Sequence, residues 1–446
     1  MHLPPSPRTP GTIQLLRWIF TPMSYMDECA SAYGDIYSLN IRPDYPTVLI
    51  SNPDALQTIL TSDTKELSSP GELNQIFTPI LGTQSLITAS GKQHSRKRQL
   101  VMPALHGERM RAYADIIYQV TDEVISTLEI GARFSIRSVT QTITLKIIMQ
   151  AVFGLYDSPR ARELEQVLKT ILDSTSSPVS LAAAAFPIFG KILGSLDPAH
   201  DFDTLLQQTN KIIYEEIQER RSNLDFEKRV DILSLLMLAR DEDGQAMTDV
   251  ELRDELMTLL TAGHETTATA LAWAVYFIYK NENVKTKLLS ELNSLGNNPD
   301  SNTVFKLPYL TAVCNETLRI YPVGLLTFPR RVEKAMSLCG YNLESGTLVY
   351  GSIYDTHHRQ DLYANPNQFK PERFLERQYS AYEFLPFGGG ARRCIGLAFA
   401  QFEMKLVLAR ILTSVQLELV TKTKVSPKRR GLVSAPNRPI YMKKLS

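Results

Sequence analysis

The chain has 446 residues, of which 43% are hydrophobic and 21% charged, and its formal net charge is +1. This balance indicates a globular protein with a large core, and it excludes a strong overall attraction to nucleic acid or to an anionic membrane. Four scattered cysteines are too few for a disulfide scaffold and fit a reducing compartment. The first apolar run is short and interrupted by Arg17, so we expect a soluble, cytoplasmic protein with neither a signal peptide nor a transmembrane anchor.

The pattern of apolar residues predicts a mainly α-helical chain with smaller β regions. Strand-like runs around turn residues predict β structure near 34–52 and near 330–355. Apolar residues at three-and-four spacing predict helices over much of the remainder. We find no repeats and no long low-complexity linker, and we expect one domain over residues 1–446. The apolar segment 181–198, broken by Pro and Gly, fits a core loop and a mobile lid equally well.

The stretch 248–281 predicts a long helix whose centre contradicts its buried character. Thr248 and Glu251 form a capping-box pattern at its start. Residues 262–267, "AGHETT", then place a glycine and a carboxylate where an apolar core is expected. Glycine costs helix stability and a buried carboxylate costs more unless it is paired, so this stretch suggests a site. The "HE" pair begins like the zinc motif HExxH, but Ala268 replaces the second histidine, so a zinc protease is unsupported. A helix kink with satisfied side chains remains the alternative.

A second helix, ending at Pro322, carries an acid and a base three residues apart. Glu316 and Arg319 share one face of this helix. Arg373 lies further on, beside prolines that fix the backbone, and a carboxylate between two guanidiniums could lock helix to loop. The alternative is a surface ion pair of little value.

The stretch 385–396, "LPFGGGARRCIG", places one cysteine behind three consecutive glycines. Phe387, Gly390, Arg392, Cys394 and Gly396 fill the pattern F-x-x-G-x-R-x-C-x-G. Glycines let backbone approach a flat ligand, and nearby arginines favour a thiolate. A phosphate loop lacks the Gly-Lys-Ser/Thr that should follow, and a cysteine nucleophile lacks an evident histidine. The pattern suits a metal with one protein ligand, as in thiolate-ligated haem.

Taken together, these motifs resemble the cytochrome P450 superfamily over essentially the whole chain, and more narrowly its cyanobacterial members of the fatty-acid and terpenoid hydroxylase type. In that resemblance, 262–267 is similar to the oxygen-binding motif, Glu316-x-x-Arg319 to ExxR, 371–374 to PERF, and 387–396 to the haem loop. The resemblance implies the cytochrome P450 fold, with haem b (iron protoporphyrin IX) between the long central helix and the cysteine loop.

The resemblance also implies a role for each matching residue. Cys394 is expected to be the proximal thiolate ligand of the haem iron. Glu265 and Thr266 are expected to supply protons, while Ala262 and Gly263 keep side-chain bulk away from the oxygen. Further haem contacts are expected from Phe387, Gly388, Arg392, Gly396, Ala400, His94, Arg98 and Arg330. Of these, Arg392, His94, Arg98 and Arg330 (with Arg331 as the alternative) match propionate partners, and Glu316, Arg319 and Arg373 match the structural lock.

The activity that the resemblance implies is insertion of one oxygen atom from O2 into a C–H bond or C=C of an apolar substrate, with a long-chain fatty acid or a terpenoid favoured. Candidate pocket residues are Phe77, Leu325, Leu326 and Phe328, with core packing as the alternative for each. A P450-like isomerase or peroxide-using enzyme that needs no external electrons, and a non-catalytic haem-binding protein, remain as alternatives.

The electron donor that the resemblance implies is a separate ferredoxin or flavodoxin with its NAD(P)H reductase. A basic docking face for an acidic carrier is one expectation, and scattered solvated charge is the other. The candidate cations are Arg96, Lys97, Arg393, Lys405 and Arg410.

Overall fold

The computed structural model describes residues 3–42, 45–62, 66–107, 109–154, 158–175, 199–223, 227–296, 299–431 and 433–446. The apolar segment 181–198 therefore lies outside the described residues. The chain divides into two compact units. We call the first, Met1–Pro70 with Pro308–Cys394 and Lys424–Arg438, the strand-rich unit. The second, the helical unit, comprises Gly71–Leu307, Ile395–Thr423 and Pro439–Ser446.

The strand-rich unit is built on a five-stranded sheet in the order β1-β2-β8-β5-β3. Its strands are β1 (Ile36–Leu39), β2 (Thr47–Ile50), β8 (Leu348–Gly351), β5 (Arg330–Val332) and β3 (Leu67–Ser68). β1 and β2 are antiparallel, whereas β2 and β8 are parallel. Two small hairpins, β6 (Met336–Leu338) with β7 (Tyr341–Leu343) and β10 (Pro427–Arg430) with β11 (Val433–Pro436), complete its strands. Strands thus lie within both regions where the sequence predicts β structure.

The helices of the strand-rich unit follow local signals in the sequence. Asn52 caps α3 by accepting hydrogen bonds from two backbone amides, and Pro53 stands in the first turn. Apolar side chains of α3, including Leu56 and Ile59, pack with Val48 and Ile50 of β2 in one buried cluster. The remaining helices are α1 (Gly11–Phe20), α2 (Pro22–Tyr33), α3 (Pro53–Thr61), α16 (Pro308–Ile320), α17 (Ile353–His358), α18 (Arg373–Glu376) and the 3-10 turn η5 (Gly390–Arg392).

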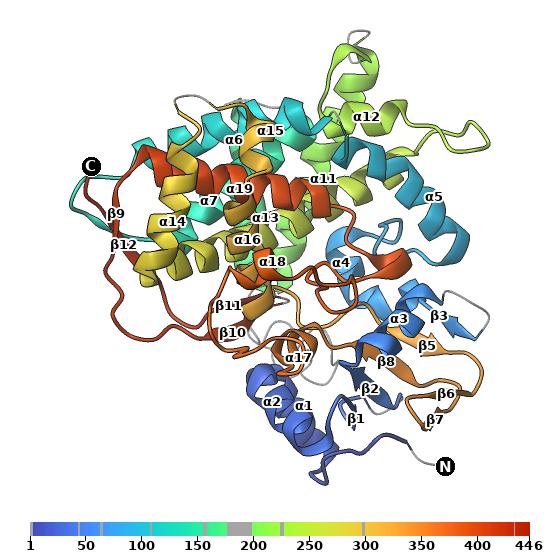
Figure 1. The fold of residues 1–446 in the computed structure, drawn as a ribbon. Helices are drawn as coiled ribbons and strands as arrows, with labels where there is room; N and C mark the ends of the chain where they lie inside the picture. The colour runs from blue at the N-terminus through green and yellow to red at the C-terminus, as the bar shows by residue number, and fades with distance from the viewer. Residues whose placement is uncertain are drawn as a thin grey trace. The chain divides into compact units, whose positions relative to one another are not determined.

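The helical unit is organised around α13, which runs from Asp249 to Lys280 as the sequence predicts. Thr248 and Glu251 form the expected capping box at its start. α13 packs most extensively against α7 (Ile136–Phe153), and α6 (Arg109–Ser126) and α19 (Leu397–Ser414) complete the surrounding layer (Figure 1). Among the described residues, no helix combines the length and apolar character that crossing a membrane requires.

Shorter elements surround this helical core. They are η1 (Gly71–Phe77), α4 (Thr78–Leu81), α5 (Gly91–Val101), η2 (Met102–Leu105), α6 (Arg109–Ser126), α8 (Pro159–Thr175), α11 (Ala199–Ser222), α12 (Ile232–Leu238), α14 (Glu282–Asn293), α15 (Ser301–Phe305) and α19 (Leu397–Ser414). A three-stranded antiparallel sheet, β4 (Arg133–Ser135), β12 (Tyr441–Lys444) and β9 (Leu417–Leu419), lies in the same unit.

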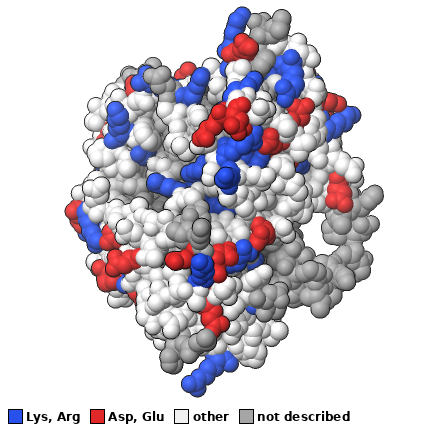
Figure 2. Space-filling model, turned by 90° about the vertical axis from the view of Figure 1, so that its right-hand side faces the viewer, with Lys and Arg blue, Asp and Glu red and all other residues white. Residues whose placement is uncertain are grey.

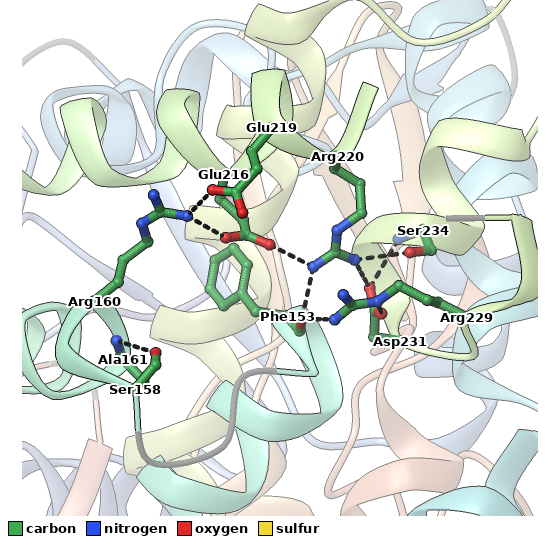
Figure 3. Close-up of polar contacts among 10 residues, drawn as sticks. All are labelled: Phe153, Ser158, Arg160, Ala161, Glu216, Glu219, Arg220, Arg229, Asp231 and Ser234. Carbon is green, nitrogen blue, oxygen red and sulfur yellow. Dashed lines mark hydrogen bonds and ion pairs between the residues drawn. The ribbon is translucent and has the colours of Figure 1, made fainter. Parts of the chain in front are cut away.

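A buried ion network ties the ends of four helices of this unit together (Figure 3). Arg220 of α11 donates to Phe153 O at the end of α7 (2.8 Å), to Asp231 Oδ1 before α12 (2.5 Å) and to Glu216 Oε1 (2.5 Å). Arg160 of α8 reaches Glu216 Oε2 at 2.9 Å. Because the Arg220 side chain is 2% exposed and its guanidinium pairs with both Glu216 and Asp231, this network fixes how the helix ends meet.

Candidate functional site

The cysteine loop of the strand-rich unit folds as its glycines require. Gly388 and Gly390 have φ of +67° and +64°, a left-handed conformation that favours glycine. A Cβ at Gly390 would lie 1.8 Å from Leu60 O, so only glycine fits against α3. The Cys394 amide donates to Phe387 O at 2.9 Å, which closes the loop. Cys394 itself is an exposed residue of this loop.

Two buried arginines adjoin this loop. Arg330, on β5, is 1% exposed, and its Nε donates to Ile59 O at 3.1 Å. Its Nη2 would lie 3.1 Å from a Cβ at Gly390, so the guanidinium lies directly beside the loop. Arg392, within the loop, donates from Nη2 to Ser69 O at 2.7 Å and from Nε to Ser69 Oγ at 3.1 Å. The alternative, Arg331, pairs with Glu333 Oε1 at 2.8 Å instead, which favours Arg330 as the arginine of the site.

The structure brings the three residues of the predicted lock together. Arg319 binds Glu316 through both oxygens, at 2.7 Å from Nε and 2.9 Å from Nη2. Arg373 Nε lies 3.1 Å from Glu316 Oε1, and the Lys370 amide donates to the same oxygen at 2.8 Å. The side chains are 0%, 0% and 5% exposed for Glu316, Arg319 and Arg373. The lock is therefore a buried ionic triad, and the surface-pair alternative is wrong.

The centre of α13 carries the predicted oxygen-binding motif on a continuous helix. Ala262 is exposed and Thr266 is half-buried, although the helix on both sides of this stretch is largely buried. Thr266 Oγ1 donates to Ala262 O at 2.6 Å, so the hydroxyl is paired within its own helix turn. Gly263 has a packing reason as well, because a Cβ there would lie 3.2 Å from Ile148 Cδ1 of α7.

Glu265 is held by partners on α7 that the sequence analysis missed. Arg137 Nη2 forms a short ion pair with Glu265 Oε1, and Gln141 Nε2 donates to Oε2 at 3.0 Å. The Arg137 and Glu265 side chains are 13% and 17% exposed. These partners come from a helix more than a hundred residues earlier, so only the four-residue spacing of Arg137 and Gln141 on one helix face could have suggested them.

His264 is buried against α7, where it packs and hydrogen-bonds. Its Nδ1 lies 2.9 Å from Thr144 Oγ1, and its side chain is buried. Burial, and next the charge of Arg137, lower the pKa of His264 to about 4. The imidazole is therefore neutral at physiological pH and belongs to the packing of α7 on α13.

The other predicted haem residues of the helical unit lie on two helices. His94 and Arg98 share one face of α5, where His94 is buried and Arg98 half-buried. Gly396 precedes α19, and Ala400 in its first turn donates its amide to Gly396 O at 2.8 Å. These four residues remain predictions as haem contacts.

Most cations proposed for a docking face are engaged within the protein. Arg96 pairs with Asp241 and Glu251, and Lys97, 2% exposed, lies 3.1 Å from Glu251. Lys405 is buried and donates to Phe305 O, and Arg410 pairs with Asp122 at 2.6 Å. On the face shown in Figure 2, Lys and Arg side chains lie beside Asp and Glu. Lys97 and Lys405 are buried, and Arg96 and Arg410 are ion-paired, so these four do not offer the exposed, unneutralised charge that the docking face requires. Arg393 is exposed.

The candidate pocket residues differ in their surroundings. Leu325 is 6% exposed and packs in a buried cluster with Met26 and Tyr37, and Leu326 packs against the same cluster. Core packing therefore describes Leu325 better than a pocket wall does. Phe77, in η1, and Phe328, which precedes β5, are half-buried and remain predictions.

These observations fit a haem held by a thiolate. An exposed cysteine follows a glycine turn that is too tightly packed for side chains, and two buried guanidiniums, groups that pair well with carboxylates, lie beside that turn. The family model for Cytochrome P450 matches residues 4–443. The chain therefore belongs to the cytochrome P450 family.

Relatives and a solved structure agree with this assignment. Cytochrome P450 135B1 of Mycobacterium tuberculosis is 32% identical over 439 residues, which cover 98% of this chain and 90% of that protein. Cytochrome P450 135A1 of the same species is 30% identical, with 99% and 95% covered. The retinoic acid-bound cyanobacterial CYP120A1 shares the fold with a TM-score of 0.83 at 22% identity, covering 99% of each chain. The predicted family, fold class and cofactor, haem b, are confirmed, and the chain is a monooxygenase.

Proposed function

We propose that Cys394 is the thiolate ligand of the haem iron and that Arg330, Arg392, His94 and Arg98 bind the propionates. The observation that carries this proposal is the exposed cysteine that follows a tightly packed glycine turn, with two buried guanidiniums beside that turn. Haem with a thiolate ligand supplies the oxygen-activating chemistry when bound. The protein orients this group, pairs its carboxylates with cations and controls access of water and protons.

The groups for proton supply are Thr266 and Glu265. A hydroxyl can both donate and accept, so Thr266 can exchange its 2.6 Å bond to Ala262 O for a bond to a water or ligand. Glu265 is fixed by Arg137 and Gln141, so its carboxylate must leave at least one of these partners before it carries a proton to Thr266. The role of Glu265 as a relay thus includes the breaking of the Gln141 hydrogen bond or of the Arg137 ion pair.

For the substrate we propose a long apolar molecule, a fatty acid or a terpenoid. The half-buried aromatic side chains of Phe77 and Phe328 and the accessible Ala262 support an apolar contact surface. The fold relative CYP120A1 was solved with retinoic acid, a terpenoid carboxylic acid, which makes this molecule a natural first ligand to test. A separate ferredoxin or flavodoxin with its NAD(P)H reductase is proposed as electron source.

An optical spin-state titration of the purified ferric protein tests the substrate proposal. Saturated fatty acids, sesquiterpenes, retinoic acid and steroids are added separately, and a saturable shift with one of the first three classes is the expected result. Phe328→Ala should weaken that shift, whereas Leu325→Val, a core change, should affect unfolding more than binding. Absence of a shift with every fatty acid and terpenoid would overturn the substrate class and leave the haem chemistry untouched.

Turnover separates the proposed monooxygenase from its alternatives. Substrate-dependent NAD(P)H consumption with surrogate redox partners, together with an oxygenated product, is expected. Product formation that needs no external electrons would instead support an isomerase or a peroxide-using enzyme. Ligand binding without any product would support a haem-binding protein.

A further inference from the structure

A buried histidine, His357 in α17, links the ionic lock to the start of the cysteine loop. Its side chain is fully buried, at 0% exposure. Its Nε2 accepts a hydrogen bond from the Leu385 amide at 3.0 Å, and Leu385 is the residue from which the loop departs. Its carbonyl oxygen accepts from Arg319 Nη1 at 2.7 Å. One residue therefore contacts both the lock and the loop, and all three lie in the strand-rich unit.

The surroundings of the imidazole fix its orientation. The ring stacks on Phe384 with centroids 5.4 Å apart and an interplanar angle of 27°, and it meets Tyr363 edge-on at 6.3 Å. Tyr363 in turn lies against the guanidinium of Arg319 at 5.0 Å. The ring is therefore held by Phe384 and Tyr363, the residue's carbonyl oxygen is held by Arg319, and Nε2 is directed at the Leu385 amide.

The protonation state follows from the hydrogen bond. Since Nε2 accepts, the neutral ring carries its proton on Nδ1. Among the described residues, Nδ1 makes no hydrogen bond of full geometry, although the backbone of Leu318 and Arg319 at the end of α16 lies near the ring. A buried donor with only such a weak partner costs free energy that an apolar ring would not cost. A histidine stands here despite this cost because its Nε2 accepts the hydrogen bond from the Leu385 amide, which a phenylalanine ring cannot do.

We propose that His357 is a positioning residue for the cysteine loop, fixing its first backbone amide to the Glu316–Arg319–Arg373 lock. After Leu385, two backbone hydrogen bonds shape the loop. The Gly388 amide donates to Leu385 O at 2.9 Å, and the Cys394 amide donates to Phe387 O. The anchor at Leu385 thus precedes the two hydrogen bonds that shape the loop, and it determines where Cys394 stands. This inference rests on the proposed role of Cys394 as iron ligand.

Substitutions of His357 separate the contribution of its Nε2 acceptor from the contribution of its aromatic stacking. His357→Phe keeps an aromatic ring for stacking but has no acceptor. His357→Gln loses the ring, yet its side-chain oxygen reaches about as far as Nε2, whereas His357→Asn reaches only as far as Nδ1. The neighbouring His358 supplies a matched control, because its Nδ1 bonds Tyr354 O at 2.8 Å within its own helix and makes no described contact with the loop.

Amide hydrogen exchange of the haem-loaded protein measures directly whether the bond from the Leu385 amide to His357 Nε2 protects the loop. In His357→Phe and His357→Asn, we expect peptides covering 385–394 to exchange about fivefold faster or more, since one hydrogen bond is lost. His357→Gln and His358→Phe should retain exchange close to that of the native protein. Peptides of α16 should be unchanged in all variants. Equal loop exchange in His357→Phe and the native protein, or equal loosening in His357→Gln and His357→Asn, would overturn the proposal.

A spectroscopic signature completes the test. The reduced carbon monoxide complex distinguishes thiolate ligation from its loss, and His357→Phe and His357→Asn should lose the thiolate form faster in mild urea than His357→Gln does. Should Cys394 prove not to be the ligand, Cys394→Ala would leave that spectrum normal, while the exchange experiment would still decide the anchor. Failure of the two proposals is therefore distinguishable.

Discussion

The substitution Glu316→Gln tests the buried lock most sharply. The Glu316 carboxylate accepts four hydrogen bonds, two from Arg319, one from Arg373 and one from the Lys370 amide, at 2.7–3.1 Å. Glutamine turns one oxygen into a donor and removes the charge, so two buried guanidiniums, 0% and 5% exposed, lose their anion. Breaking a buried ionic group in this way costs ~3–5 kcal/mol.

The size of this loss is large for a domain whose total stability is ~5–15 kcal/mol. Urea unfolding followed by circular dichroism measures it, provided that the slope of the transition is compared as well as its midpoint. Glu282→Gln is the matched control, because Glu282 is 76% exposed and pairs with Lys285 at 3.3 Å, and such a pair is worth ~1 kcal/mol or less. A loss for Glu316→Gln as small as that of the control would refute the reasoning that the triad is a buried lock.

Three further predictions concern the centre of α13. Thr266→Ala removes the hydroxyl that bonds Ala262 O, and we expect electron consumption to become uncoupled from product with release of peroxide, whereas unchanged coupling would contradict proton steering. Arg137→Met leaves the half-buried Glu265 without its cation and should lower the free energy of unfolding by ~1–3 kcal/mol, with Arg137→Lys retaining part of it in urea titrations. The pKa of His264 is about 4 in the folded protein against 6.5 in the unfolded chain. The unfolded chain therefore binds the extra proton, and the free energy of unfolding should fall by ~3 kcal/mol as pH drops from about 6.5 to 4. His264→Gln should flatten this part of the plot of stability against pH, and an unchanged plot would refute the prediction.

Local patterns in the sequence were sufficient for the features that depend on neighbouring residues. The capping box at Thr248 and the helix that follows depend on spacings of three and four residues, and the structure shows both. Glu316 and Arg319 are three residues apart on one helix face, so their contact was predictable. Helix α17, which begins at the end of the predicted β region 330–355, was missed, although Ser352, whose side chain accepts from the Asp355 amide, is a recognisable N-cap.

Contacts between distant segments could not be predicted in the same way. Arg137 and Glu265 meet because α7 lies along α13, and no periodicity in either helix specifies that pairing. The burial of Lys97 and its bond to Glu251 likewise depend on how α5 meets the start of α13. The proposed docking face failed for this reason, since the sequence shows the sign of a charge but not the partner that neutralises it. The bond between His357 and the Leu385 amide belongs to the same class.

The most direct test of the central claim is the absorption spectrum of the reduced carbon monoxide complex in the native protein and in Cys394→Ala, with Cys339→Ala as the control for an exposed cysteine outside the loop. Thiolate ligation predicts the red-shifted Soret band in the native protein and in Cys339→Ala, and its absence in Cys394→Ala. A normal shift in Cys394→Ala would contradict the assignment of Cys394 as iron ligand and, with it, the site proposed here.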